Sequence, residues 1–400
     1  MTTLPDALRG SRLADPRGVA LLLGVAQTLA WASSYYLPAV LAPAVVADLG
    51  ADPALVYGAF SLALLISGLA APRTGRAIEQ FGGRPVLILS SCVIALGLLL
   101  LGLLPGIWGW FLGWIVLGPG MALGLYEAAF ATLGVLYGQA ARRSITLVTL
   151  VAGFASTVGW PLTAALLPLL GWRGTCLAYA GINLLLVLPL YLLLPRRGTG
   201  AGAPESGPAR IEAPPPAAWV RRSFLLLAGF FTIRALISAT LSVHMITVLG
   251  GLGLSVAAAV GAASLMGPSQ VGGRLLEFTL GKGAHPLTVA RLGAALLPLG
   301  ALALVLAGPV AAVPFVLLYG ASNGILTISR GAVPLALFGA RGYPVLMGRL
   351  ALPILLAQAA APALTAPLVA ALPAAAVLGL AGLLAALAMA CLLPLRPLPR

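Results

Sequence analysis

The stretch Gly75-Arg-Ala-Ile-Glu-Gln-Phe-Gly-Gly-Arg-Pro85 is a polar, glycine-rich loop between two long apolar runs. A shorter copy, Gly273-Arg-Leu-Leu-Glu277, follows almost half a chain later and also lies between apolar runs. Both copies read Gly-Arg-x-(Ile/Leu)-Glu, which indicates that the 400-residue chain consists of two related halves. An internal repeat of this size in an apolar chain is typical of secondary transporters.

Composition excludes a water-soluble protein. Hydrophobic residues make up 60% of the chain and charged residues only 8%, whereas a soluble domain carries about 25% charged residues. Apolar runs of about 20 residues, the length that crosses a bilayer, recur throughout the chain. Strand-like alternation is absent from the sequence, so helices are expected to satisfy the backbone. The sequence therefore predicts an all-α membrane protein, with the lipid bilayer as a partner.

Twelve membrane-spanning helices are expected, six on each side of a linker. The linker, 195–222, is rich in proline, glycine and arginine and cannot bury a core. We expect a cytoplasmic tail at 1–17, an N-terminal six-helix bundle at 18–194, a C-terminal six-helix bundle at 223–395 and a tail at 396–400. The predicted spans are roughly 18–46, 54–72, 85–105, 107–138, 142–170, 173–194, 223–249, 255–280, 285–307, 309–338, 344–371 and 373–395.

The basic residues predict the orientation of these spans. With the N-terminus inside, nearly all arginines fall in cytoplasmic segments, and Arg173 is the only one in an outer loop. This asymmetry predicts that both termini are cytoplasmic in a multi-pass protein of a bacterial inner membrane. It also accounts for the net charge of +14, so no nucleic-acid partner is expected. The first apolar run is too long for a signal peptide and is interpreted as a retained span.

The sequence resembles the major facilitator superfamily over about the whole chain. The family loop between spans two and three reads Gly-x-x-x-Asp-Arg/Lys-x-Gly-Arg/Lys-Arg/Lys. Gly75, Gly82 and Arg84 match it, and Glu79 stands for the aspartate. Gln80 and Gly83 depart from the pattern, since both replace basic residues. The resemblance implies two pseudo-symmetric bundles that alternate access to a central cavity.

The resemblance also implies a gate latch at this loop. A carboxylate at a helix end pairs with arginines and helix dipoles of the facing half, and releases when the halves move. We assign Gly75, Glu79, Gly82 and Arg84 to the latch of the first half. Arg274 and Glu277 are its counterparts in the second half. The alternative is a plain charged turn that only fixes topology.

Three ionisable residues lie inside predicted spans: Glu127, Arg234 and Arg330. Such residues are costly in a membrane and are functional candidates by default. They fall in spans four, seven and ten, and the resemblance implies that spans one, four, seven and ten line the cavity. Arg330 shares a helix face with Tyr319 and Asn323. A guanidinium with a neighbouring hydroxyl and amide suits a carboxylate ligand. The alternative is that the arginines extend to the cytoplasmic interface.

Glu127 is the only acidic residue deep in a span. Two roles stay open for it: carrying a coupling proton, since a carboxylate in a low-dielectric cavity binds protons more readily, or pairing with one of the arginines. Gln27, Trp31 and Tyr126 are further candidates for substrate binding, although aromatic residues at helical spacing also serve as packing.

The sequence contains no phosphate-binding loop, metal-ligand cluster or nucleophile elbow, so we expect no enzyme activity, cofactor or metal. The first hypothesis is a monomeric secondary transporter that moves a small organic anion with protons. The Tyr-x-x-x-Asn pattern of span ten is similar to the monocarboxylate and oxalate/formate branch. That branch has its substrate arginine in span eight, where this sequence has none. The alternatives are a proton-driven efflux antiporter for drugs or metabolites and a non-transporting membrane sensor.

Overall fold

The computed structural model describes residues 15–196 and 216–396. Within these ranges the chain forms helices joined by short turns, without β-strands. Seven segments are long and apolar enough to cross a membrane, and some are several helices in succession. The segment Gly106–Leu192 alone runs through the fourth, fifth and sixth predicted spans. Most of the predicted linker lies outside the described residues.

The chain divides into two compact units. The first contains the described residues up to 196 together with Gly339–Leu352, and the second contains the described residues from 216 to Phe338 and from Pro353 onward. The sequence-based division placed 339–352 in the C-terminal bundle, whereas this segment packs with the first unit. The Tyr343 ring lies against Gly134 of the first unit, and glycines of the segment make further close contacts there, described below.

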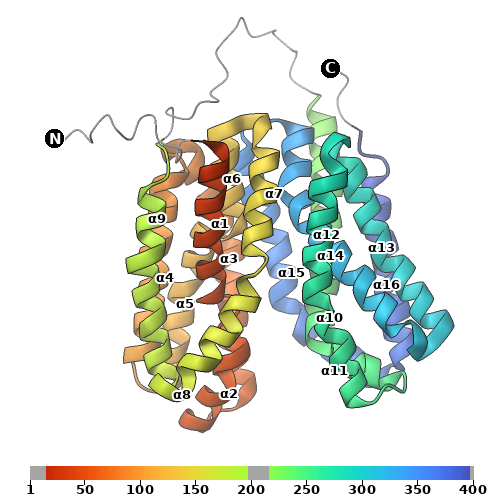
Figure 1. Ribbon diagram of the computed structural model, residues 1–400, viewed down its shortest axis with the longest axis horizontal. Helices are drawn as coiled ribbons and strands as arrows, with labels where there is room; N and C mark the ends of the chain where they lie inside the picture. Colours follow the sequence, from red (N-terminus) through yellow and green to blue (C-terminus); the bar gives the residue numbers. More distant parts are fainter. Residues whose placement is uncertain (1–14, 197–215, 397–400) are drawn as a thin grey trace, which may run out of the picture. The chain divides into compact units, whose positions relative to one another are not determined.

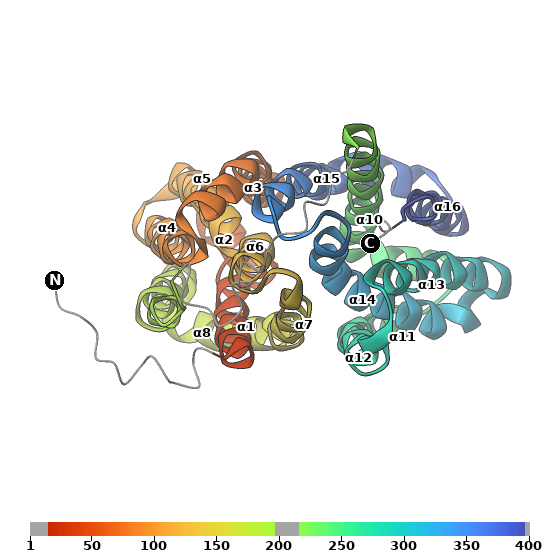
Figure 2. The same cartoon turned by 90° about the horizontal axis from the view of Figure 1, so that it is seen from above.

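The first unit begins with helices whose first residues are prolines or follow a capping side chain. Proline suits the first turn because its missing N–H has no intrahelical partner there. Asp52 caps α3 by accepting a hydrogen bond from Ala54 N at 2.8 Å. Figures 1 and 2 show α1, α6 and α7 next to one another in this unit. The helices are α1 (Pro16–Ala32), α2 (Pro38–Leu49), α3 (Pro53–Phe81), α4 (Gly83–Leu103), α5 (Gly106–Gly124), α6 (Tyr126–Tyr137), α7 (Ala141–Ala152), α8 (Ala155–Ile182) and α9 (Leu188–Leu192).

Several predicted spans of the first unit are broken helices. Span one is α1 and α2, separated by the turn Ser33–Leu37, and span four is α5 and α6, separated at Leu125. Span five breaks between α7 and α8, and α8 bends sharply into span six at Gly171, whose φ is 64°. A five-residue π-helix, Asn183–Val187, follows α8. Irregular backbone at membrane depth needs hydrogen-bond partners, and at the π-helix the buried Ser91 Oγ donates to the carbonyl of Asn183 at 2.6 Å.

The second unit contains longer, mostly unbroken helices, apart from the break at Leu265 in span eight. Helix α10 starts before the predicted seventh span, so the last residues of the predicted linker are helical. Figures 1 and 2 show α13 beside α16. The helices are α10 (Ala217–Gly251), α11 (Val256–Ser264), α12 (Met266–Leu280), α13 (Pro286–Ala307), α14 (Ala312–Phe338), α15 (Tyr343–Ala371), whose first residues belong to the first unit, and α16 (Ala374–Leu392).

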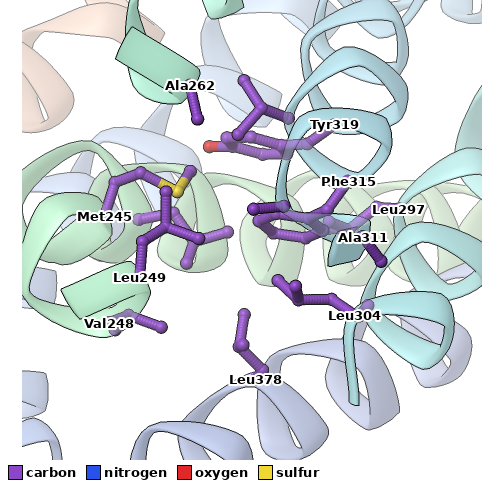
Figure 3. Packing of buried hydrophobic residues seen from close by; sticks show 14 of the residues in the cluster. Met245, Val248, Leu249, Ala262, Leu297, Leu304, Ala311, Phe315, Tyr319 and Leu378 are labelled. Atoms are coloured by element: carbon purple, nitrogen blue, oxygen red, sulfur yellow. The ribbon is translucent and has the colours of Figure 1, made fainter. Parts of the chain in front are cut away.

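The apolar core of the second unit lies between α10, α11, α13, α14 and α16 (Figure 3). Phe315 and Tyr319 stack at 6.0 Å with their rings 8° from parallel. Both side chains are fully buried, and the leucines and valines around them close the core. At the cytoplasmic side predicted from the sequence, Arg291 of α13 donates to the carbonyls of Leu392 and Leu395 at 2.7–3.1 Å. It thereby caps the C-terminus of α16, whose last carbonyls lack helical partners.

Candidate substrate and gate sites

Arg234 is one of the buried charged residues among the described residues of the second unit. It lies in α10, and only 6% of its side chain is exposed. Its Nη2 donates to Asn323 Oδ1 at 2.9 Å and to Ser322 Oγ at 3.2 Å, both on α14. Ser322 Oγ donates in turn to the carbonyl of Gly293 on α13, at 2.6 Å. The structure thus brings together two of the predicted substrate residues, Arg234 and Asn323.

The rest of the Arg234 guanidinium has no partner in the described residues. Its Nε and Nη1 are buried and form no hydrogen bond, and no ion pair involving Arg234 is found among the described residues. After Glu212 the sequence contains one acidic residue, Glu277 in α12. Removing a charge from water without a counter-ion costs several kcal/mol. Arg234 therefore presents two buried donors and a positive charge, which suits an anion.

The other two residues of the predicted span-ten stripe have different surroundings. The Tyr319 ring is part of the apolar core, and its hydroxyl lies 3.3 Å from Ser238 Oγ (Figure 3). Arg330 is half-buried on α14, two helical turns or about 10 Å beyond Asn323. Ser322 was not among the sequence-based candidates. Ser322 lies on a different face of α14 from the Tyr319-Asn323-Arg330 stripe, and its side chain points toward α13. Searching the sequence for residues on the face of that stripe therefore does not find it.

In the first unit, a hydrogen bond from Gln27 of α1 stabilises the interruption between α5 and α6 in span four. At Leu125 the backbone leaves the helical conformation, with φ −83° and ψ −166°. The N–H of Ala128 then bonds to Leu125 O at 3.0 Å instead of to Gly124 O. Gln27 Nε2 donates to the released Gly124 carbonyl, at 2.5 Å. Gln27 is fully buried, so this hydrogen bond satisfies a carbonyl that water does not reach.

The break gives Glu127 a special position. Glu127 lies in the first turn of α6, immediately after the break, and is half-buried. The N-terminus of a helix carries partial positive charge, which stabilises a carboxylate there. In an unbroken span four the same residue would be in the middle of a helix. Discontinuous helices of this kind often form binding sites in transporters.

An aromatic cluster surrounds Trp31 on the same helix as Gln27. The ring centroids of Tyr126, Tyr35 and Tyr36 lie 4.9, 5.0 and 5.8 Å from that of Trp31. Tyr126 also stacks on Phe130 at 5.2 Å. The sequence-based candidates included Trp31 and Tyr126 but not the two other tyrosines. The turn that ends α1 brings those tyrosines to Trp31, and no helical periodicity predicts it.

Two of the residues predicted to form a latch, Gly75 and Glu79, lie beside the segment 339–352. A Cβ at Gly75 would collide with the carbonyl oxygen of Pro344, and one at Gly348 with that of Ala71. The Cβ position of Gly342 lies 4.0 Å from Glu79 Oε1. Glu79 is therefore beside the residue that precedes α15, within the first unit.

The remaining latch residues are distributed over both units. Gly82 adopts φ 81° between α3 and α4, a conformation that glycine reaches without strain, and Arg84 follows it, half-buried. In the second unit Arg274 and Glu277 lie one turn apart on α12 and are 5% and 7% exposed.

Comparison with known proteins identifies the family. The sequence profile of the Major Facilitator Superfamily matches residues 23–343, most of the chain. The chain belongs to the major facilitator superfamily. Twelve membrane-spanning helices in two pseudo-symmetric bundles are the architecture of this family, so the predicted fold class is confirmed. Among curated proteins, none matches this sequence.

Solved structures of superfamily members share this fold. A variant of the E. coli fucose:proton symporter FucP superposes with a TM-score of 0.67 at 17% identity, covering 94% of this chain and 96% of that one. The human organic anion transporter MFSD10 superposes with a TM-score of 0.72 at 16% identity, covering 94% and 99%. The proton:xylose symporter XylE gives a TM-score of 0.72 at 13% identity, covering 93% and 94%. At these identities the likeness concerns the fold alone.

Proposed function

We propose that this superfamily member is a secondary transporter that moves a small organic anion together with protons, and that Arg234 binds the anionic group. The observation that carries the proposal is the buried Arg234 guanidinium, which has two donors without partners and no counter-ion in the described residues. An anionic group can accept a charge-assisted hydrogen bond from Nε or from Nη1. Asn323 and Ser322 hold Nη2 of the same guanidinium in place.

Further parts of the proposal come from the sequence. Arg330 is a second anion-binding candidate, and Glu127 is the candidate proton carrier. We propose a monomer in a bacterial inner membrane with both termini in the cytoplasm. Glu79 and the glycines around it are proposed to form a latch that opens during the cycle.

A thermal-shift screen of the purified protein tests the anion site. Small carboxylates, amino acids, sugars and lipophilic cations are compared, and a ligand at 100 times its Kd adds about 2.7 kcal/mol to the folded state. We expect carboxylates to stabilise the wild type and Arg222→Gln, a control at an exposed position of the same helix. Arg234→Gln is expected to lose this response.

The stability of Arg234→Gln without ligand separates two roles for this residue. If Arg234 serves to bind an anion, Arg234→Gln removes a buried charge that has no counter-ion in the free protein. The ligand-free variant is then at least as stable as the ligand-free wild type. A marked loss of stability in the free protein, with the carboxylate response retained, would show that Arg234 is structural. Stabilisation by lipophilic cations alone would favour the efflux antiporter.

A further inference from the structure

We propose that the end of the first unit predicted to be cytoplasmic binds an anionic phospholipid, whose phosphate lies between Arg84 and Arg196. The inference goes beyond the proposed function and does not depend on it, because it concerns the membrane around the protein rather than the transported molecule. The residues that carry it all belong to the first unit.

Arg84 and Arg196 bring two positive charges together. Arg84 lies near the start of α4, and Arg196 follows the end of α9. Figure 1 shows α4 and α9 side by side, and Ser91 Oγ of α4 donates to the carbonyl of Asn183, at the start of the π-helix that leads into α9. The two guanidinium groups are close enough for their charges to repel each other.

Nothing in the described part of the chain compensates the charge of Arg84. Its side chain is half-buried and forms no hydrogen bond or ion pair with another described residue. Among the described residues, the charge that acts on it is that of Arg196. An anionic group between the two arginines would replace this repulsion by attraction on both sides. Phosphate oxygens suit the position, because guanidinium groups bind them with strong charge-assisted hydrogen bonds.

Exposed leucines next to the two arginines supply a surface for acyl chains. Leu89 and Leu96 of α4 are exposed and lie on one helix face, about 7 and 18 Å along the axis from Arg84. One leaflet of the hydrocarbon core is about 15 Å deep, so this face spans it. Leu192 and Leu193, at the end of α9 and before Arg196, are exposed as well. A phospholipid uses both the arginines and the leucines, whereas a free inorganic anion uses only the arginines.

The predicted orientation favours an anionic lipid over a zwitterionic one. The cytoplasmic leaflet is rich in anionic headgroups, which attract every basic residue at that surface. A specific site therefore has to differ from this general attraction. Its binding must depend on Arg84 and Arg196 and not on other exposed arginines of the same unit.

Lipid titrations of the delipidated protein in detergent, followed by native mass spectrometry, test the inference. We expect phosphatidylglycerol to bind the wild type about tenfold more tightly than phosphatidylcholine, since each arginine at an anionic headgroup contributes about fivefold. Arg84→Gln should reduce the ratio to about twofold, and Arg84→Lys, which keeps the charge, should retain most of it. Arg143→Gln, at an exposed arginine of α7 in the same unit, is the matched control and should keep the full ratio.

Several results would overturn the inference. They are equal binding of the two lipids, an unchanged ratio in Arg84→Gln, and equal losses in Arg84→Gln and Arg143→Gln, which would indicate a diffuse attraction. Inorganic phosphate that raises the melting temperature as much as phosphatidylglycerol does would show a free-anion site instead. If Arg84→Gln does not fold, Arg196→Gln, at an exposed position, carries the same expectation. The carboxylate response of Arg234 is measured without added lipid, so its outcome bears on the proposed function alone.

Discussion

Asp48, just beyond the end of the predicted first span, shows how single side chains tie the first unit together. Its Oδ2 accepts from Trp172 Nε1 at 3.0 Å and from Arg173 Nη1 at 2.6 Å. Arg173 also lies over the Trp172 ring, 4.2 Å from its centroid. The hydrogen bonds from Trp172 and Arg173 hold the pKa of Asp48 below its ordinary value. Both stabilise the ionised carboxylate, and the contact joins α2 to α8.

A pH dependence follows from the lowered pKa of Asp48. A carboxyl group whose folded pKa is depressed stabilises the protein above its unfolded pKa, near 3.9, and loses this contribution as pH falls through the folded pKa. We expect Asp48→Asn to lower the melting temperature slightly at neutral pH, since the pair is exposed. The difference from the wild type should disappear in strong acid. Asp15→Asn, at another exposed aspartate, is the control, and a difference that persists unchanged in acid would contradict this account.

At the residue scale, sequence reasoning finds charges more readily than their partners. Arg234 and Asn323 can be selected from the sequence as candidate binding residues, because ionisable and amide side chains are rare in apolar spans. Arg173 stands out as the lone basic residue of the outer loops, but its partner Asp48 lies 125 positions away. Only the packing of α2 against α8 brings the two together, and no local pattern encodes it.

At the scale of elements, glycines determine how closely helices approach. Gly75 of α3 touches the backbone of Pro344 and Val345, whereas nothing lies within 4 Å of a Cβ placed at Gly58 of the same helix. The packing of segment 339–352 against α3 thus requires a residue without a side chain at position 75. It places no such requirement on position 58.

These two glycines give a matched pair of substitutions. Gly75→Ala should destabilise the protein by about 1–3 kcal/mol, because the added methyl group meets backbone that cannot rotate away. Gly58→Ala should be neutral or stabilising by up to about 1 kcal/mol, since alanine is the better helix former. Denaturation in detergent measures both. Equal effects of the two substitutions would be inconsistent with the described contact.

The spans themselves can be predicted from the sequence, and their breaks cannot. Runs of apolar residues reveal the number of spans because the bilayer fixes their length. The break at Leu125 falls at a residue with no breaking tendency of its own. It is held by Gln27 of another helix, so it is a tertiary effect. For the same reason the position of Glu127 in the first turn of α6 could not be foreseen.

At the scale of the whole molecule, the repeated Gly-Arg-x-x-Glu sequence predicts two related halves, and membership of the superfamily agrees with it. Composition alone indicates a membrane protein. The substrate cannot be predicted from the sequence in the same way. Its recognition depends on a few side chains whose hydrogen-bond partners lie on helices distant in the sequence.

The proposed proton coupling concerns the complete transport cycle. We expect Glu127→Gln to abolish uptake driven by a pH gradient in proteoliposomes, since the amide cannot carry a proton. Counterflow exchange of substrate should persist, because it needs no net proton movement. Asp52→Asn, which removes an acidic residue at the start of α3, should retain both activities. Wild-type uptake by Glu127→Gln would remove this residue from the mechanism.

Helix α15 continues without interruption from Tyr343 to Ala371, yet the border between the two units crosses it between Leu352 and Pro353. Proline has no N–H to bond to the carbonyl of Arg349, and its ring pushes that carbonyl aside. The helix is therefore weakened at Pro353, as it is at Pro362 and Pro367 further along. The first turns of α15, before this proline, are fixed by a different contact, the close approach of Pro344 to Gly75 of α3.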